Sequence, residues 1–385
     1  MRVVVATTAG AGHFGPLLPF ARALRDGGHD VVVTAPTSFA TAVERAGFTH
    51  HSFADASPEA QGAVFAGLAG LSNEEGNAIV IRDVFARIDA RAALPDMTAL
   101  LDTWQPDIVV RETAEFASFV AAEGAGIPHV QVAIGLTAFD ELYLPVLDAP
   151  LAELGSRSGV DGLIASPRLS LLPESYDGDA GIMTTRRYRD VPDAAVRPLP
   201  DWWPGSALRR PQPRPLVYVT FGSVAGGLGL YPSLYQQVVA AVADLPVRVL
   251  MTTGEAADLA ALGTLPPNVH VERWWPQEDV MPHAAAIVGH GGFGTTLLGL
   301  ASGLPMVVVP LFADQPYNAA RVAAIGAGVA LEGGPAAVGD LADGLRLVLS
   351  EESYRRCARS VAEEIGRLPP VAECVPFLEQ IAAGA

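Results

Sequence analysis

The stretch that decides the fold is RVVVATTAGAGHFGPLLPFARALRDGGHDVVVTAP, residues 2–36. Residues 2–8 are mostly β-branched with no polar alternation, which is typical of a strand buried on both faces of a parallel sheet. A glycine-rich turn follows, and Pro16 is predicted at the first position of a helix whose apolar residues recur at helical spacing. A second apolar run closes a β-α-β unit. The sequence therefore predicts an α/β fold.

The same alternation continues along the chain and predicts two doubly wound halves with parallel sheets. We predict an N-terminal domain over 1–200, a proline-rich linker over 201–215, a second domain over 216–365 and a C-terminal helix over 366–385 that crosses back to the first domain. The predicted strands beyond the opening unit are 106–112, 128–134, 216–223, 247–254, 268–275, 284–290 and 305–310.

Composition limits the ligands of this chain. The 385 residues carry 25 basic and 42 acidic side chains, so the formal net charge is -17, and every basic side chain is arginine. An acidic surface argues against nucleic acid or an anionic membrane as a partner. Any anionic ligand must therefore be held locally, by backbone amides and helix N-termini.

The cellular setting is predicted from the cysteines and the apolar runs. The two cysteines, Cys357 and Cys374, imply neither a disulfide framework nor a zinc site. We therefore expect a reducing, cytoplasmic compartment. The opening residues do not resemble a signal peptide, and the longest apolar stretch, 284–312, is interrupted by His290 and several glycines, so no membrane span is expected.

The glycines of the opening turn have the G-x-G-x-x-G spacing of dinucleotide sites, but a histidine lies among them. A dinucleotide site also needs an acidic residue at the end of the second strand, where this chain has Thr34, Ala35 and Pro36. This argues against a nicotinamide or flavin site. His13 instead lies where open α/β sheets bind ligands, which suits proton transfer. The alternative is a turn histidine that only bonds backbone.

The segment 288–322, VGHGGFGTTLLGLASGLPMVVVPLFADQPYNAARV, predicts an anion site at the start of a helix. It lacks the Gly-Lys-Ser/Thr of a Walker loop, so a diphosphate that leaves fits better than one that donates phosphate. Asp314 and Gln315 follow the next strand at the same sheet edge and suit sugar hydroxyls. The candidate phosphate-binding residues are Ser223, His290, Gly291, Gly292, Gly294 and Thr295.

With the preceding WWPQ at 274–277, this segment resembles the donor signature of family 1 glycosyltransferases of the GT-B fold, especially bacterial enzymes that modify natural products. The resemblance extends over almost the whole chain, from the GHFGPLLPFARAL segment at 12–24 to the 288–319 block. It implies two Rossmann-like domains facing across a cleft, a nucleoside-diphosphate sugar bound mainly by the C-terminal one and a small-molecule acceptor bound mainly by the N-terminal one. No metal and no further cofactor are implied.

The resemblance assigns roles to individual residues. His13 matches the general base, and Glu112 falls where the family often has an acidic partner that orients this base. The alternative for Glu112 is a solvated charge at a strand end. Trp274 matches the aromatic side chain that stacks on the donor base, with Trp275 and Gln277 beside it. The alternative for the tryptophans is core packing. His290 and Thr295 match diphosphate contacts, and Asp314 and Gln315 match sugar contacts.

One departure from the family pattern concerns the ribose. Many uridine-diphosphate users have a glutamate three residues after the position of Thr295, where this chain has Leu298. A buried 2′-hydroxyl without a partner costs about 1–3 kcal/mol, so we expect a dTDP-sugar rather than a UDP-sugar. The D-x-D of YDGD, 176–179, lies in a glycine-rich loop, and we predict no metal site there.

The acceptor wall is predicted from apolar stretches at 53–95 and 133–145, which are equally compatible with ordinary helix cores. Their aromatic candidates are Phe53, Phe65, Phe85 and Phe139. The sequence leaves open the sugar, the acceptor atom and the oligomeric state, a homodimer included. We predict an inverting glycosyltransferase. The alternatives are a sugar-nucleotide epimerase of similar fold, a non-catalytic nucleotide-binding homologue that regulates a partner enzyme, and a nicotinamide dehydrogenase.

Overall fold

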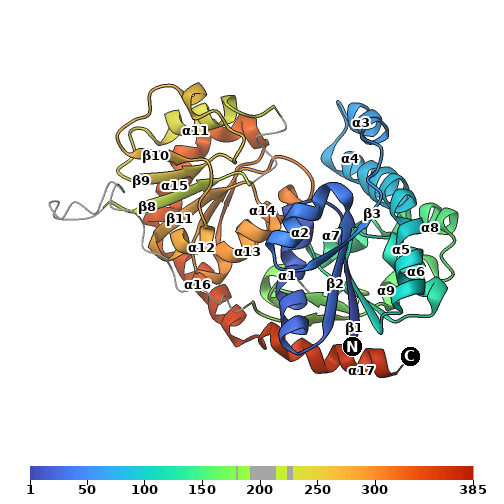
Figure 1. The fold of residues 1–385 in the computed structure, drawn as a ribbon. Coiled ribbons are helices and arrows are strands. Elements are labelled where there is room, and N and C mark those ends of the chain that lie inside the picture. The colour runs from blue at the N-terminus through green and yellow to red at the C-terminus, as the bar shows by residue number, and fades with distance from the viewer. Residues whose placement is uncertain (179–180, 191–213, 223–228, 385) are drawn as a thin grey trace. The chain divides into compact units, whose positions relative to one another are not determined.

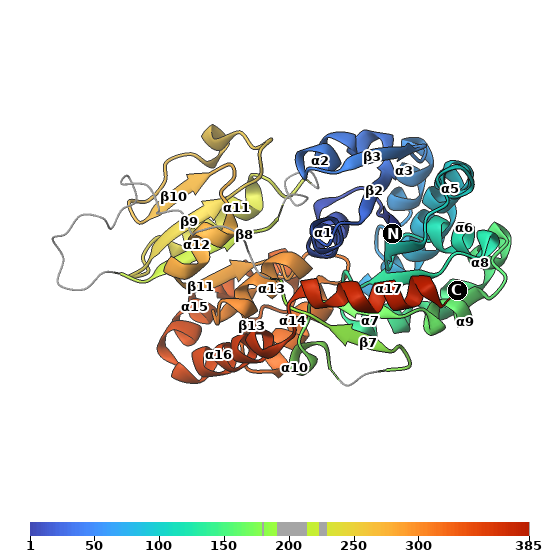
Figure 2. The ribbon, with the colours of Figure 1, turned by 60° about the horizontal axis from the view of Figure 1, so that its bottom comes forward.

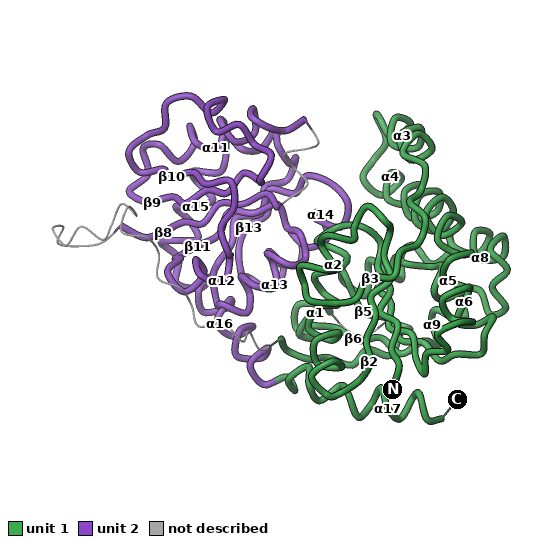
Figure 3. Tube along the Cα trace, viewed as in Figure 1, with its two compact units in different colours: residues 1–191, 368–385 green, residues 192–367 purple. Residues whose placement is uncertain are grey.

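The computed structural model describes residues 1–178, 181–190, 214–222 and 229–384 (Figure 1). The chain forms two compact units (Figure 3): unit 1 comprises 1–191 and 368–385, and unit 2 comprises 192–367. The linker predicted at 201–215 lies outside the described residues except for its last two positions. None of the helices in the described ranges is long and apolar enough to cross a lipid bilayer.

Unit 1 is built on a parallel sheet whose seven described strands have the order β3-β2-β1-β4-β5-β6-β7. Val3, Val4 and Val5 are fully buried in β1, as expected for a central strand covered on both faces. The strands are β1 (Arg2–Ala6), β2 (Asp30–Pro36), β3 (Thr49–Phe53), β4 (Ile108–Glu112), β5 (His129–Val132), β6 (Arg168–Ser170) and β7 (Thr185–Arg187).

Helices connect these strands, and one stretch of them, Val80–Asp89, is a π-helix. The α-helices are α1 (Ala11–Asp26), α2 (Ala40–Arg45), α3 (Pro58–Ala66), α4 (Asn73–Ile79), α5 (Ala90–Trp104), α6 (Ala117–Ala125), α7 (Thr137–Leu142), α8 (Asp148–Leu154), α9 (Gly159–Ala165), α10 (Glu174–Asp177) and α17 (Val375–Ala383). Short 3₁₀ turns are Thr37–Phe39, Leu144–Val146 and Val371–Cys374.

The last segment of the chain packs in unit 1, where Figure 2 shows α17 in red. The Arg189 N–H donates to the Pro369 carbonyl at 2.9 Å, and the Val371 N–H donates to the Arg189 carbonyl at 3.0 Å. The Arg186 guanidinium lies 3.9 Å from the ring centroid of Phe377 in α17. These contacts attach the C-terminal helix to the edge strand β7 and the residues that follow it.

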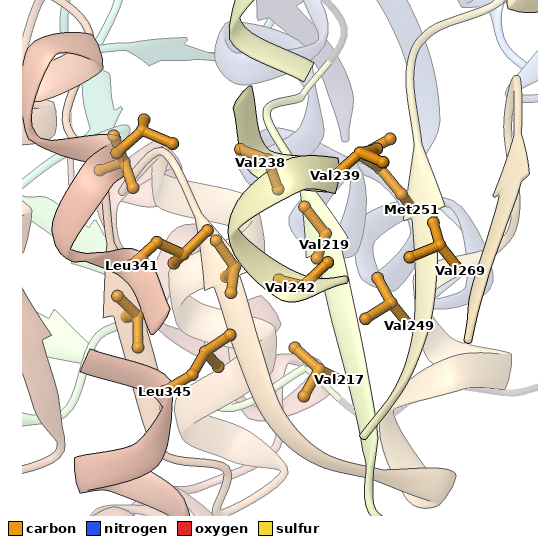
Figure 4. Close-up of a cluster of buried hydrophobic side chains, with 14 of the residues drawn as sticks. Val217, Val219, Val238, Val239, Val242, Val249, Met251, Val269, Leu341 and Leu345 are labelled. Atoms are coloured by element: carbon orange, nitrogen blue, oxygen red, sulfur yellow. The ribbon is translucent and has the colours of Figure 1, made fainter. Parts of the chain in front are cut away.

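Unit 2 has a parallel sheet of six described strands in the order β10-β9-β8-β11-β12-β13. Its core is a cluster of valines and leucines from the sheet, α11 and α15 (Figure 4). The strands are β8 (Leu216–Thr220), β9 (Arg248–Thr252), β10 (Val269–Glu272), β11 (Ala284–Gly289), β12 (Met306–Val308) and β13 (Gly328–Ala330). The helices are α11 (Ser233–Val242), α12 (Gln277–Val280), α13 (Phe293–Ala301), α14 (Gln315–Ala324), α15 (Leu341–Ser350) and α16 (Glu352–Arg367), with 3₁₀ turns at Leu259–Leu262, Met281–His283 and Gly334–Asp340.

The predicted α/β fold with two parallel sheets is confirmed. In each sheet the strand order reverses once, between β1 and β4 in unit 1 and between β8 and β11 in unit 2. Ligands of open α/β sheets bind beyond the carboxyl ends of the two strands at such a switch point, because the connections leave there in opposite directions. His13 follows β1 and Glu112 ends β4, whereas His290 directly follows β11.

Candidate active site

His13 lies in the first turn of α1, which begins at Ala11. This corrects the prediction that Pro16 opens the helix, since Pro16 and Pro19 both lie inside it. Each proline lacks the N–H of one helical hydrogen bond. The helix tolerates this loss because its core face is fully buried, at Leu17, Phe20, Ala21 and Leu24.

The structure brings His13 and Glu112 together. The Nδ1 atom of His13 lies 3.0 Å from Oε1 of Glu112, and the exposed fractions of the two side chains are 22% and 0%. The hydroxyl of Thr8 also donates to Oε1 at 3.0 Å, and the N–H of Ala114 donates to Oε2. Glu112 is therefore not the solvated charge of the alternative interpretation.

The protonation state of this pair follows from its surroundings. Burial raises the pKa of Glu112, but the charge of His13 and the hydrogen bonds from His13, Ala114 and Thr8 outweigh it, so the pKa lies below its usual value. The ionised carboxylate can only accept, and Nδ1 of His13 must therefore be the donor. In the neutral imidazole this donor role places the lone pair on Nε2, the atom that a general base uses.

Two further side chains lie near His13. The Phe85 ring of the π-helix is 5.3 Å from the His13 ring, centroid to centroid. Asp89, at the end of the same π-helix, accepts a hydrogen bond from Nε2 of Gln61 at 2.7 Å. Burial raises the pKa of Asp89 to about 6, against the lowering effects of Gln61 and the charge of His13. A π-helix is rare and is often found at functional sites.

The other acceptor candidates have different environments. Phe53 is only 4% exposed and packs in the core of unit 1, where the end of β3 contacts α5, as the core-packing alternative expects. Phe65 in α3 is 52% exposed. Phe139 in α7 packs against Tyr143, with ring centroids 5.0 Å apart. Asp177 of the YDGD motif accepts hydrogen bonds from Thr137 and Arg187, which fixes the start of α7.

In unit 2 the ring of His290 lies between two glycines. A Cβ atom on Gly222 would be 2.9 Å from the ring, and one on Gly292 would clash with Nε2. Burial lowers the pKa of His290 to about 4, so the imidazole is neutral at pH 7. Nδ1 is buried and has no hydrogen-bond partner among the described residues. His290 can therefore offer one N–H to an anion, but it does not offer a positive charge.

The helix α13 begins beside this ring, with Gly292 as its N-cap. No side chain of the described residues caps the helix, and its first turn carries no acidic residue. The first N–H groups of a helix have no partner within the helix and favour an anion. Thr295 lies in this turn and is 8% exposed. The predicted phosphate-binding residues His290, Gly292, Gly294 and Thr295 are thus brought together, whereas Ser223 lies outside the described residues.

The two predicted sugar contacts differ. Asp314 is the N-cap residue of α14 and is half-buried. Gln315 is buried, and its Oε1 accepts hydrogen bonds from the N–H groups of Leu311 and Phe312 at 2.9 and 3.1 Å. This side-chain oxygen holds the preceding loop, which leaves only the Gln315 amide nitrogen for a sugar.

Trp274 is 61% exposed, which excludes the core-packing alternative for this residue. The predicted strand over 268–275 ends at Glu272 in β10, so Trp274 lies beyond the sheet. Trp275 is half-buried, and Gln277 is the first residue of α12. The exposed indole face can stack on a flat ligand.

Sequence reasoning missed three polar residues of these sites: Thr8, Asp89 and Asn318. Thr8 lies two residues after the end of the first strand, and this position alone could have indicated a contact to Glu112. Asp89 and Asn318 lie within helices, where nothing in the local pattern separates them from solvent-facing polar positions.

Comparison with known proteins identifies the class. The model for the N-terminal domain of "Erythromycin biosynthesis protein CIII-like" proteins matches 22–222, and the model for the C-terminal domain matches 236–381. L-demethylnoviosyl transferase from Streptomyces niveus is 32% identical over 375 residues, which cover 96% of this chain and 95% of that protein. Elloramycin glycosyltransferase ElmGT from Streptomyces olivaceus is 32% identical over 394 residues, which cover 97% of this chain and 95% of that protein.

Solved structures of glycosyltransferases have the same fold as this chain. The glycosyltransferase VinC, solved with dTDP, superposes with a TM-score of 0.78 at 26% identity over all of both chains. SsfS6 from Streptomyces sp. SF2575, solved with thymidine diphosphate, superposes with a TM-score of 0.75 at 26% identity over 99% of both chains. The fold and these relatives define an enzyme that transfers a glycosyl group. The chain belongs to the family 1 glycosyltransferases of the GT-B fold, in the erythromycin biosynthesis protein CIII-like branch of antibiotic biosynthesis.

Proposed function

We propose that this enzyme transfers a sugar, with inversion, from a dTDP-sugar to a hydroxyl group of a small apolar acceptor of the natural-product type. In this proposal residues 1–200 bind the acceptor, residues 216–365 bind the donor, and 366–385 complete the first domain. The observation that carries the proposal is the 3.0 Å contact between His13 Nδ1 and Glu112 Oε1.

The base chemistry follows from this contact. Nε2 of His13 takes the acceptor proton as the acceptor oxygen bonds to the anomeric carbon on the face opposite the nucleotide. The bond between this carbon and the diphosphate breaks, and the diphosphate leaves with the electron pair. One displacement inverts the configuration. Glu112 stabilises the imidazolium that forms, and general-base help of this kind contributes about 10²–10⁴ in rate.

Backbone and neutral groups would hold the leaving diphosphate. The N–H groups at the start of α13 and the imidazole N–H of His290 are donors that need no net positive charge. This matters in a chain whose formal net charge is -17. Trp274 would stack on the nucleotide base through its exposed face.

A thymidine nucleotide is supported by Leu298, which lies half-buried in α13 and cannot hydrogen-bond a ribose 2′-hydroxyl. VinC and SsfS6 were solved with thymidine diphosphate, in line with this preference. For the acceptor, Phe85 beside His13 favours an apolar, flat molecule whose hydroxyl reaches Nε2.

The test is calorimetric titration of the wild-type chain, without metal, with thymidine diphosphate, uridine diphosphate and NADH. We expect thymidine diphosphate to bind most tightly. Tighter binding of uridine diphosphate would remove the ribose argument and keep the enzyme class, whereas binding of NADH alone would overturn the proposal.

Turnover separates the remaining alternatives. A glycosyltransferase consumes a dTDP-sugar in step with glycoside formation when an acceptor from a natural-product panel is present. An epimerase converts the donor without any acceptor, and a regulatory homologue binds the nucleotide but yields no glycoside with any member of the panel.

A further inference from the structure

Asn318 of α14 joins two segments of the candidate donor site. It is 1% exposed, and its Nδ2 donates to the Gly291 carbonyl at 2.8 Å and to Oδ2 of Asp314 at 2.7 Å. An amide nitrogen has two N–H groups, and these two bonds account for both. The side chain thus connects the glycine turn that follows β11 with the turn that precedes α14.

The bond to Gly291 determines the orientation of a peptide plane. Gly291 has φ 83, and a Cβ on it would lie 2.9 Å from Cγ1 of Val308 and 3.0 Å from the carbonyl of Gln315, so the turn packs directly against its neighbours. The Gly291 carbonyl and the Gly292 N–H belong to one planar trans peptide and point in opposite directions. Holding this carbonyl therefore aims the Gly292 N–H away from Asn318. The Gly292 residue itself lies beside the ring of His290, since a Cβ on it would clash with Nε2.

The bond to Asp314 holds a turn that has an uncommon conformation. Ala313 has φ 55, in the left-handed region, which is unfavourable for a residue with a Cβ. On one side of Ala313, Gln315 Oε1 holds the N–H groups of Leu311 and Phe312. On the other side, Asn318 holds the carboxylate of Asp314 and fixes one of its oxygens.

We propose that Asn318 is a positioning residue that couples the diphosphate half and the sugar half of the donor site. One amide group aims an N–H of the glycine turn and orients the Asp314 carboxylate, so a change at Asn318 weakens both halves together. This inference rests on the proposed function, because it takes the glycine turn as the diphosphate site and Asp314 as a sugar contact.

The experiment measures the dissociation constants of thymidine diphosphate and dTDP-glucose by calorimetry. The variants are Asn318→Ala, the isosteric Asn318→Asp and Asp314→Ala. In Asn318→Asp a carboxylate would face the Gly291 carbonyl and Asp314, so both bonds are lost while the volume is kept. We expect both Asn318 variants to bind thymidine diphosphate about 10-fold more weakly and to lose the additional affinity that the glucose provides. Asp314→Ala should lose only that additional affinity.

Asn268→Ala is the matched control. Asn268 is a buried asparagine of the same unit whose Nδ2 donates to the carbonyls of Val242 and Leu245 at 3.0 and 3.5 Å, and neither of these residues belongs to the donor site. It should lower the thermal unfolding midpoint without changing either dissociation constant.

Two results would overturn the inference. One is wild-type affinity of the Asn318 variants for both ligands, and the other is an equal loss of binding in Asn268→Ala, which would assign the effect to general destabilisation. Failure of the proposed function has a different signature. Without a nucleotide-sugar site the wild-type chain itself would bind neither ligand, whereas an epimerase or a regulatory homologue would bind them but form no glycoside in the transfer assay.

Discussion

His13 Nδ1 lies 3.0 Å from Glu112 Oε1, although 99 positions separate the two residues in the chain. The pairing of β1 with β4 explains this proximity. Ala6, the last residue of β1, is in register with Arg111 of β4, so the turn after β1 meets the end of β4 at one edge of the sheet. The chain folds β2 and β3 on one side of β1 before it returns to place β4 on the other side.

Removing the base should separate binding from catalysis. We expect His13→Ala to keep the wild-type dissociation constant for thymidine diphosphate and to lose about 10²–10⁴ of the transfer rate, because the proposal assigns the nucleotide to unit 2 and only the proton transfer to His13. Calorimetry and an acceptor-dependent transfer assay measure the two effects. Wild-type turnover in this variant would refute the assignment of the base.

The charge of Glu112 should affect stability as well as rate. Its folded pKa is lowered, so the ionised form stabilises the fold above the unfolded value of 4.5, and this contribution disappears as the pH falls through the folded pKa. Glu112→Gln should therefore unfold at a lower temperature than the wild type at pH 7, with the difference shrinking at acidic pH. A difference that stays constant with pH would show that shape rather than charge matters.

At Asp89 we expect the pH dependence of stability to have the opposite sign. Its folded pKa of about 6 exceeds the usual 3.8, so stability falls as the pH rises through this range and the ionised carboxylate costs stability above it. A pKa shift of two units corresponds to about 3 kcal/mol in the free energy of unfolding. Partial exposure of the Asp89 side chain reduces this contribution to roughly 1–2 kcal/mol. Asp89→Asn should raise the unfolding midpoint at pH 7.5 by ~2–6 °C and leave it unchanged near pH 3.5.

Asp83 provides the control for Asp89 on the same π-helix. Its carboxylate accepts hydrogen bonds from Arg82 and Arg87, which lower its pKa. Asp83→Asn should therefore destabilise the protein slightly at pH 7.5. A stabilising effect of the same size in both variants would mean that reduced net charge, rather than burial of Asp89, is responsible.

The close packing of His290 predicts that Gly292 tolerates no side chain. A Cβ at this position would displace the imidazole from its place beside the start of α13, so Gly292→Ala should weaken thymidine diphosphate binding by ~10-fold or more. Gly366→Ala is the control, since a Cβ in α16 would meet no atom within 4 Å. It should stabilise the helix by about 0.5–1 kcal/mol and leave binding unchanged. If Gly292→Ala binds thymidine diphosphate as tightly as Gly366→Ala does, His290 does not contribute to nucleotide binding.

The ribose preference can be tested by restoring a hydroxyl ligand. Leu298→Glu should raise the affinity for uridine diphosphate relative to thymidine diphosphate by about 1–3 kcal/mol, the value of a satisfied buried hydroxyl. Calorimetric titration with both nucleotides measures this ratio, with Leu297→Glu as a neighbouring control. An unchanged ratio in Leu298→Glu would remove the argument for a dTDP-sugar.

The sequence determined the class of fold because the patterns that encode it are local. Apolar runs without polar alternation marked β1, β4, β8 and β11, and the glycine turns marked the points where strands pass to helices. The motifs around His13 and His290 marked both candidate sites, because loops at the carboxyl ends of parallel strands are where ligands of open α/β sheets bind. The strands β3, β6, β7 and β13 were missed. β3, THHSF, is mostly polar, and β6, β7 and β13 have only three residues each and no apolar run around them that is as long as the PMVVVP of β12.

Tertiary structure decided which side chains are buried and which residues meet. Phe53 and Trp274 are both aromatic residues near strand ends, yet one is 4% and the other 61% exposed, because burial depends on the helices packed over each end. The hydrogen-bond partners of Asp89 and Asn318 are not specified by helix periodicity. Pro16 lies within a helix because burial of the core face of α1 outweighs one missing hydrogen bond. Hydrophobic periodicity is a property of neighbours in the chain, whereas strand pairing and burial depend on contacts between residues far apart in it.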